Sequence, residues 1–67
     1  MAKIQINGKK VAIKQNFTAQ DMLKKYKLNR KKVAIELNGK ILPQNEYKKK
    51  CLKNNDIIEI VQFIGGG

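Results

Sequence analysis

The chain ends in three consecutive glycines, and this tail offers the most distinctive chemistry in the sequence. Gly65, Gly66 and Gly67 directly follow an apolar segment of β type. Because glycine has no Cβ, such a tail is thin and could enter a channel too narrow for side chains. Its last residue presents an α-carboxylate with no bulk around the carbonyl carbon. We therefore expect Gly67 to be the group that is modified, and Gly65 and Gly66 to thread into partner sites.

The rest of the chain lacks most of the groups that an enzyme uses. Its 67 residues include no histidine, the commonest general base and metal ligand. The single cysteine can form neither an internal disulfide nor a two-cysteine metal site. A domain of this size also buries only a small core. We therefore expect no catalytic residue, no metal site and no bound cofactor, so that tail chemistry would need groups supplied by other proteins.

The composition is strongly basic, with 15 Lys and Arg against 5 Asp and Glu and a net charge of +10. Such a charge favours nucleic acid or another acidic partner. However, the chain has two Tyr, two Phe and no Trp, and it lacks the aromatic strand motif of RNA-binding domains. We therefore keep a basic nucleic-acid-binding module as a competing interpretation and expect the lysine runs to be mainly solvated faces.

Nothing in the sequence predicts a membrane-spanning segment or an export signal. The stretches with few charges are far shorter than the roughly 20 residues that span a bilayer. The N-terminal residues contain no apolar signal core. A lone cysteine suits a reducing compartment. We expect a cytoplasmic protein that is a monomer when free.

Period-two alternation predicts the strands. Residues 3–14 read as a hairpin around Asn7-Gly8, a dipeptide that accepts the positive φ angles of a tight turn. Residues 33–37 form the next strand, followed by a second turn at Asn38-Gly39 and a short strand over residues 40–42. A turn over residues 54–56 precedes the last strand, residues 57–64.

A helix is predicted over residues 17–28. Thr18 is the expected N-cap, and Asp21 suits the positive end of the helix dipole. An apolar stripe, which includes Met22 and Tyr26, should face the core, and Asn29 should end the helix in a left-handed conformation. The weakly patterned residues 44–52 suggest a helical turn or packed loop, in which Cys51 is expected to be a small packing residue.

These elements follow in the order ββαββ, and the helix has a single stripe to bury against the sheet. The predicted fold is therefore α+β, a ubiquitin-like β-grasp in which one main helix packs across a mixed sheet of four or five strands. We expect residues 1–64 to form a single domain and residues 65–67 a flexible C-terminal Gly-Gly-Gly tail.

A docking surface is expected beside the tail. Side chains alternate along a strand, and the face that holds Glu59 should be the solvent side. Val61 and Phe63 share that face, which would leave two apolar side chains exposed next to Ile64 and the glycines. Val61, Phe63 and Ile64 are therefore the candidate docking residues. The alternative is that Phe63 folds over a sheet edge and packs against the core.

The sequence resembles the ThiS family, the small sulfur-carrier proteins of bacterial thiamin (thiazole) biosynthesis. The resemblance covers nearly the whole chain in order and length, and the residues that carry it are Asn7-Gly8-Lys9, Val33-Ala34-Ile35-Glu36-Leu37-Asn38-Gly39, Ile41-Leu42-Pro43, Glu46-Tyr47, Leu52-Lys53-Asn54-Asn55-Asp56 and the terminal glycines. Asn55 stands where the family more often has glycine, and because asparagine also accepts a left-handed conformation, the turn should be preserved. The high charge is a second departure.

The resemblance implies a function. A ThiF-type, E1-like enzyme would use ATP and magnesium to adenylate the carboxylate of Gly67. A sulfur donor, supplied through a cysteine desulfurase, would convert the adenylate to a thiocarboxylate. The carrier would then give its sulfur to a ThiG-type thiazole synthase. Two relatives of this chemistry remain as alternatives, the small subunit of molybdopterin synthase and a ubiquitin-like protein modifier.

Overall fold

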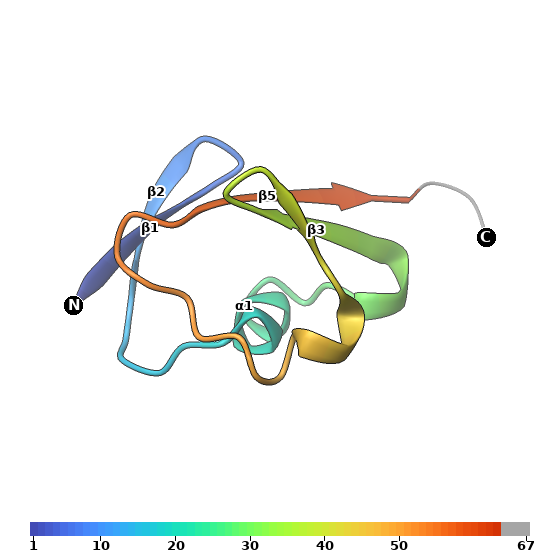
Figure 1. Ribbon diagram of the computed structural model, residues 1–67, viewed down its shortest axis with the longest axis horizontal. Helices are drawn as coiled ribbons and strands as arrows, with labels where there is room; N and C mark the ends of the chain where they lie inside the picture. The colour runs from blue at the N-terminus through green and yellow to red at the C-terminus, as the bar shows by residue number, and fades with distance from the viewer. Residues whose placement is uncertain (64–67) are drawn as a thin grey trace.

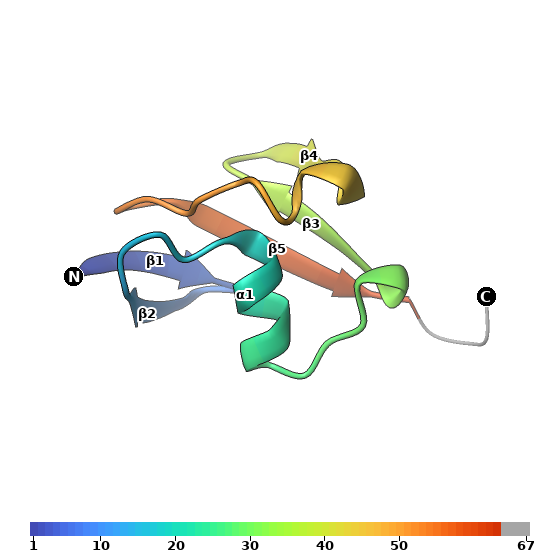
Figure 2. The same cartoon turned by 90° about the horizontal axis from the view of Figure 1, so that it is seen from below.

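A computed structural model describes residues 1–63. They form a mixed five-stranded sheet in the order β2-β1-β5-β3-β4, with one α-helix against one of its faces (Figures 1 and 2). In chain order the elements are β1 (Ala2–Ile6), β2 (Lys9–Ile13), α1 (Ala19–Lys25), η1 (Arg30–Lys32), β3 (Val33–Leu37), β4 (Lys40–Leu42), η2 (Gln44–Glu46) and β5 (Ile57–Gln62). The predicted α+β, β-grasp arrangement is confirmed.

The strand register places the last strand in the middle of the sheet. β5 runs parallel to β1 and antiparallel to β3, whereas β2 and β4 are the outer strands. The two Asn-Gly turns form as predicted, because both residues of each turn have positive φ, with Gly8 and Gly39 at +85°. Asn55 also has a positive φ of 73°, so the turn before β5 is preserved without glycine.

Thr18 caps the helix as predicted, and α1 begins at Ala19, two residues after the predicted start at residue 17. The Thr18 hydroxyl accepts a hydrogen bond from the Asp21 N–H, and the Asp21 carboxylate accepts one from the Thr18 N–H, each at 3.1 Å. This reciprocal pair is a capping box and satisfies two N–H groups at the start of the helix. It also lowers the pKa of Asp21 below its ordinary value of 3.8, mainly through the hydrogen bond from the Thr18 backbone and next through the Thr18 side chain.

The helix ends earlier than predicted. Lys27, and not Asn29, takes the left-handed conformation, with φ of +57°. The Leu28 N–H donates to the Leu23 carbonyl at 2.8 Å and the Lys27 N–H to the Lys24 carbonyl at 3.1 Å, which is the Schellman pattern of a helix C-terminus. Leu23 is buried and Leu28 is half-buried. The hydrophobic contact that usually accompanies this motif places the stop two residues before Asn29, and Asn29 caps η1 instead.

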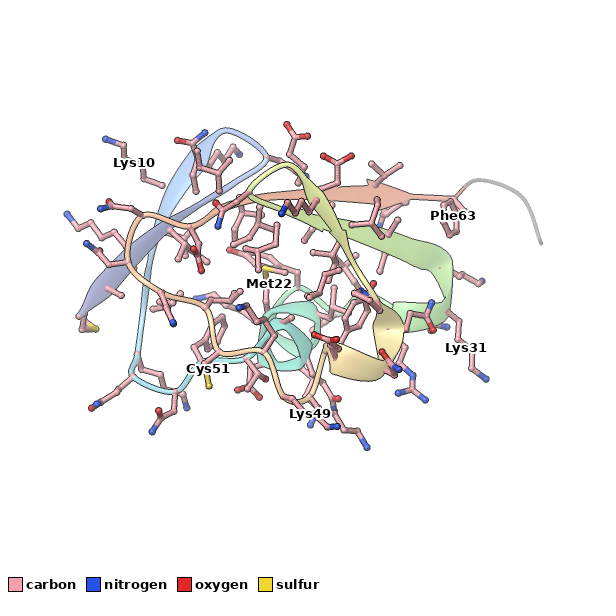
Figure 3. All side chains as sticks on the ribbon, viewed as in Figure 1. Lys10, Met22, Lys31, Lys49, Cys51 and Phe63 are labelled. Atoms are coloured by element: carbon pink, nitrogen blue, oxygen red, sulfur yellow. The ribbon has the colours of Figure 1, made fainter. Side chains whose placement is uncertain are left out.

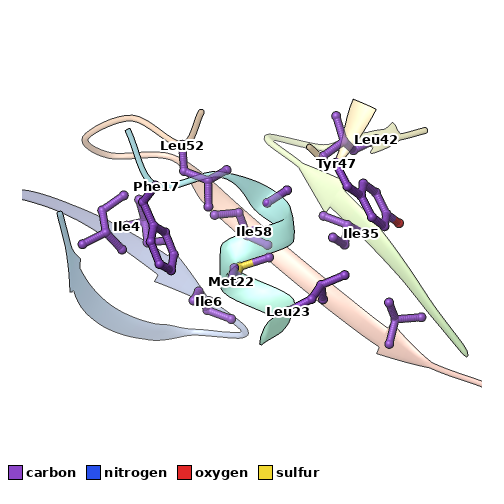
Figure 4. Close-up of a cluster of buried hydrophobic side chains, with 13 residues drawn as sticks. Ile4, Ile6, Phe17, Met22, Leu23, Ile35, Leu42, Tyr47, Leu52 and Ile58 are labelled. Atoms are coloured by element: carbon purple, nitrogen blue, oxygen red, sulfur yellow. The ribbon is translucent and has the colours of Figure 1, made fainter. Parts of the chain in front are cut away.

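The core lies between α1 and the sheet, as Figure 4 shows for its largest members, among them Ile4, Phe17, Met22, Ile35, Tyr47 and Ile58. Two expectations about packing are wrong. Tyr26, expected in the core stripe, is 41% exposed because it is the C-cap residue, where the helix has ended. Cys51 is exposed and not a packing residue. It pairs with Thr18 in an isolated β-bridge, and the next residue, Leu52, is the one that is buried.

The left-handed Lys27 predicts a stabilising substitution. A non-glycine residue in this conformation costs roughly 1 kcal/mol, which glycine avoids. Lys27→Gly should therefore raise the free energy of unfolding by up to about 1 kcal/mol, measured by urea denaturation. The matched control is Lys25→Gly, which places glycine inside the helix and should lower the same quantity by about 1 kcal/mol. A loss of stability in both variants would contradict the Schellman assignment.

The capping box predicts a pH dependence. Because the pKa of Asp21 is lower in the folded state, its stabilising contribution is present above pH 3.8 and disappears as the pH falls through the lowered value. Wild type should therefore be more stable than Asp21→Asn at pH 7, and the difference should shrink as the pH falls below 3.8 and through the lowered pKa of Asp21. Thermal unfolding of both proteins from pH 7 to well below pH 3.8 is the measurement. A difference that stays constant with pH would argue against an ionised cap.

Candidate functional site

The strand that leads to the glycine tail is held along both of its edges. On one side β5 pairs with β3 over residues 58–62. On the other side β1 ends at Ile6, and the side chain of Asn7 continues the pairing. Its Oδ1 accepts from the Ile60 N–H at 2.8 Å, and its Nδ2 donates to the Ile60 carbonyl at 3.3 Å. Asn7 therefore acts as one further strand residue beside β5.

A second turn asparagine secures the start of β5. The Asn38 Oδ1 accepts from the Ile57 N–H at 2.8 Å, while the Asn38 N–H donates to the Ile57 carbonyl at 2.7 Å. Its Nδ2 donates to the Asp56 carboxylate at 3.0 Å. The sequence predicted Asn7 and Asn38 as turn residues only. Their side-chain role was missed because each partner lies in a strand distant in sequence, 18 residues or more away.

The candidate docking residues Val61 and Phe63 are exposed as predicted, at 55% and 54%. They line different surfaces. Val61 pairs with Ala34 on the sheet face turned away from α1, which we call the outer face. Phe63 lies beyond the last residue of β5, and its N–H donates to the Lys32 carbonyl at 2.8 Å. Its ring lines a shallow depression between the end of β5 and η1 (Figure 3).

The outer face has an apolar and an acidic part. Ile41 on β4 is 66% exposed, and the sequence analysis did not select it. Its register partner on β3 is Glu36, which lies directly opposite Glu59 on β5. Like charges opposite one another weaken a strand pair. The helix covers the other face of the sheet, so these residues and Val61 are open to a partner (Figure 1).

The remaining candidate residues, Ile64, Gly65, Gly66 and Gly67, lie outside the described residues 1–63. Within that range no group of three or more His, Cys, Asp or Glu residues could hold a metal ion. No helix in the described part of the chain is long and apolar enough to cross a membrane. Burial raises the pKa of Tyr47 above its ordinary value of 10.0, which keeps its phenol neutral in the core.

Comparisons with known proteins match the chain over nearly its full length. The family model of the ThiS family matches residues 3–67. The sulfur carrier protein ThiS of Bacillus subtilis is 43% identical over 65 residues, which cover 96% of this chain and 98% of that protein. A thiazole synthase of Paramagnetospirillum magneticum is 35% identical over 97% of this chain but only 20% of its own length.

The fold comparison agrees with the sequence comparison. The crystal structure of the thiamine biosynthesis protein ThiS from Geobacter metallireducens superposes with a TM-score of 0.77 at 26% identity. The superposition covers 97% of this chain and 99% of that chain. Family model, sequence relative and solved structure thus agree over the whole domain, and the chain belongs to the ThiS family, the small sulfur carriers of thiamin biosynthesis, which are not themselves enzymes.

Proposed function

We propose that the chain carries sulfur on the C-terminal carboxylate of Gly67. The observation that supports this most directly is that the family match extends through residue 67 and so includes all three glycines. In the first step, a carboxylate oxygen attacks the α-phosphorus of ATP, held with magnesium by a ThiF-type activating enzyme, and pyrophosphate leaves. In the second step, the terminal sulfur of a persulfide on the sulfur donor attacks the carbonyl carbon and AMP leaves, which gives an acyl disulfide. A thiol then attacks the donor sulfur of that disulfide, so that the thiocarboxylate is released and a new disulfide takes up the two oxidising equivalents.

The described residues fit a carrier that presents its tail while partner enzymes supply the catalytic groups. A carboxylate is a poor acyl donor, and adenylation gives it a good leaving group, so the carrier itself needs no nucleophile or base. Its contribution is to present the tail at a fixed place. β5, secured by Asn7 and Asn38, supplies that position, and Phe63 and Val61 offer apolar surface beside it. Such exposed apolar groups next to a reactive tail are suited to partner binding.

The final acceptor of the sulfur is proposed to be a thiazole synthase. The thiazole synthase of Paramagnetospirillum magneticum contains a segment similar to almost all of this chain, which accounts for one fifth of that protein. A carrier-like segment joined to a synthase in one polypeptide supports a working pair of the two. The same family match favours the thiazole pathway over a molybdopterin synthase subunit, a protein modifier or a nucleic-acid module. The activating enzyme and a cysteine desulfurase complete the proposed set of partners.

Intact-mass spectrometry tests the tail chemistry. The chain is incubated with a ThiF-type enzyme, ATP, magnesium, a cysteine desulfurase with cysteine, and a thiol reductant. The expected product is heavier by the exchange of one oxygen for one sulfur, because the thiocarboxylate replaces the carboxylate. Removal of Gly67 should abolish the exchange, while Lys10→Gln, an exposed change far from Phe63, should leave it intact (Figure 3). Equal exchange with and without Gly67 would reject the carrier assignment.

Phe63→Ala tests the docking role of the residue at the end of β5. Because its side chain is about half exposed, the substitution should change the free energy of unfolding by less than about 1 kcal/mol. The dissociation constant for the activating enzyme should rise by about tenfold, as expected for an apolar anchor at an interface. Titration calorimetry measures the affinity, and Ile57→Ala at the opposite end of β5 is the matched control. An unchanged affinity would remove Phe63 from the docking surface.

A further inference from the structure

The basic charge of the chain is concentrated in one stretch. Between Asp21 and Glu36 the sequence contains no acidic residue and six basic ones, which are Lys24, Lys25, Lys27, Arg30, Lys31 and Lys32. All six are exposed. They occupy the last turn of α1, the stop that follows it and η1. The four that follow the helix, namely Lys27, Arg30, Lys31 and Lys32, are called the tail-root patch below.

The tail-root patch lies beside the end of β5. Figures 1 and 2 both place η1 next to the end of this strand. Lys27 and Lys32 line the same depression as Phe63, together with Leu28 and Val33, and its volume is about 330 Å³. The depression is also lined by the polar side chains Asn29 and Gln62, so that its lining combines apolar groups, two amides and two cations. A polar ligand without negative charge would leave both cations without a partner.

Backbone hydrogen bonds hold the patch in place relative to the strand. The Lys32 carbonyl accepts from the Phe63 N–H at 2.8 Å. The Asn29 Oδ1 accepts from the Lys31 N–H at 2.9 Å, and the Gln44 Nε2 donates to the Arg30 carbonyl at 2.9 Å. The charged side chains thus project from a segment whose main chain is tied to β5, to its own cap and to η2. The points from which these side chains leave the main chain are therefore fixed relative to β5.

The length of the tail limits how far a partner can be from this patch. Four residues lead from Phe63 to Gly67, and four residues span at most about 14 Å when fully extended. An enzyme that acts on the Gly67 carboxylate must therefore bring its own protein surface close to Phe63. Since Lys32 is hydrogen-bonded to Phe63, that surface must also meet the tail-root patch.

We infer that the tail-root patch docks on an acidic rim around the channel of the activating enzyme that receives the tail, with an acidic residue of that rim seated between Lys27 and Lys32 in the depression. The inference rests on the proposed function and adds the chemistry of the partner surface. Opposite charges at the margin of an interface raise the association rate constant more than they lengthen the lifetime of the complex. That property suits a carrier that must bind and leave two enzymes in turn.

Two charge-matched double variants test the inference. Lys31→Gln/Lys32→Gln removes two charges from the patch, and Lys10→Gln/Lys49→Gln removes two charges that lie away from Phe63 (Figure 3). Each lowers the net charge from +10 to +8 (10 − 2 = 8). At low salt the patch variant should bind the activating enzyme about tenfold more weakly, mainly through a slower association rate. The control should stay within about twofold, and Lys31→Arg/Lys32→Arg should retain wild-type affinity.

The salt dependence gives a second readout. Added salt should weaken wild-type binding and reduce the difference between wild type and the patch variant, because exposed charges are screened. Equal weakening of both double variants, with normal sulfur loading of wild type, would overturn the inference and leave the proposed function standing. Failure of wild type to bind the enzyme or to load sulfur would overturn both. If the patch variant lost affinity for a single-stranded oligonucleotide but kept its affinity for the enzyme, the patch would be a nucleic-acid site instead.

Discussion

β5 lies between β1 and β3, so the strand that leads to the glycine tail is the central strand of the five-stranded sheet. Ile58, its second residue, is fully buried in the core. Main-chain hydrogen bonds supply most of the constraint, and where β1 ends the side chain of Asn7 supplies the rest. The positions of Phe63 and of the tail-root patch both depend on this strand, because the patch is joined to it through Lys32.

The side chains that stabilise the fold are buried, whereas those proposed to meet partner proteins are exposed. The described core contains apolar side chains and one tyrosine, and no charged side chain is buried in residues 1–63. α1 covers one face of the sheet and leaves the outer face to Glu36, Glu59 and Val61. Changes to exposed residues can therefore alter partner choice with little effect on stability. This is the arrangement expected of a carrier whose partners perform the catalysis.

Local signals predicted most of the fold. Asn-Gly turns, period-two alternation and the Thr18 cap depend on neighbours in the chain, and each formed where the sequence indicated. The helix end did not, because the hydrogen bond from the Leu28 N–H to the Leu23 carbonyl ends the helix before Asn29 is reached. The exposure of Cys51 also depends on tertiary pairing, since its bridge to Thr18 joins residues 33 positions apart (51 − 18 = 33).

The candidate site was predictable in part. Alternation along the last strand correctly placed Val61 on the exposed face, because a strand has a strict period of two. It did not place Phe63, which lies beyond the strand and lines the depression with Lys27 and Lys32. A lysine run alone cannot show which of its members lie beside a distant strand. That information required the hydrogen bond between Phe63 and Lys32.

The central place of β5 also sets the order of events during synthesis. β5 follows every other strand in the chain, and its register with β1 joins residues 52 positions apart, Gln5 and Ile57 (57 − 5 = 52). Until the ribosome has released β5, the facing edges of β1 and β3 have no partner, and pairing across such a separation is slow. A nascent chain therefore cannot complete its sheet early. Any molecule that withstands cellular proteases as a folded domain has already acquired the strand that leads to the glycine tail.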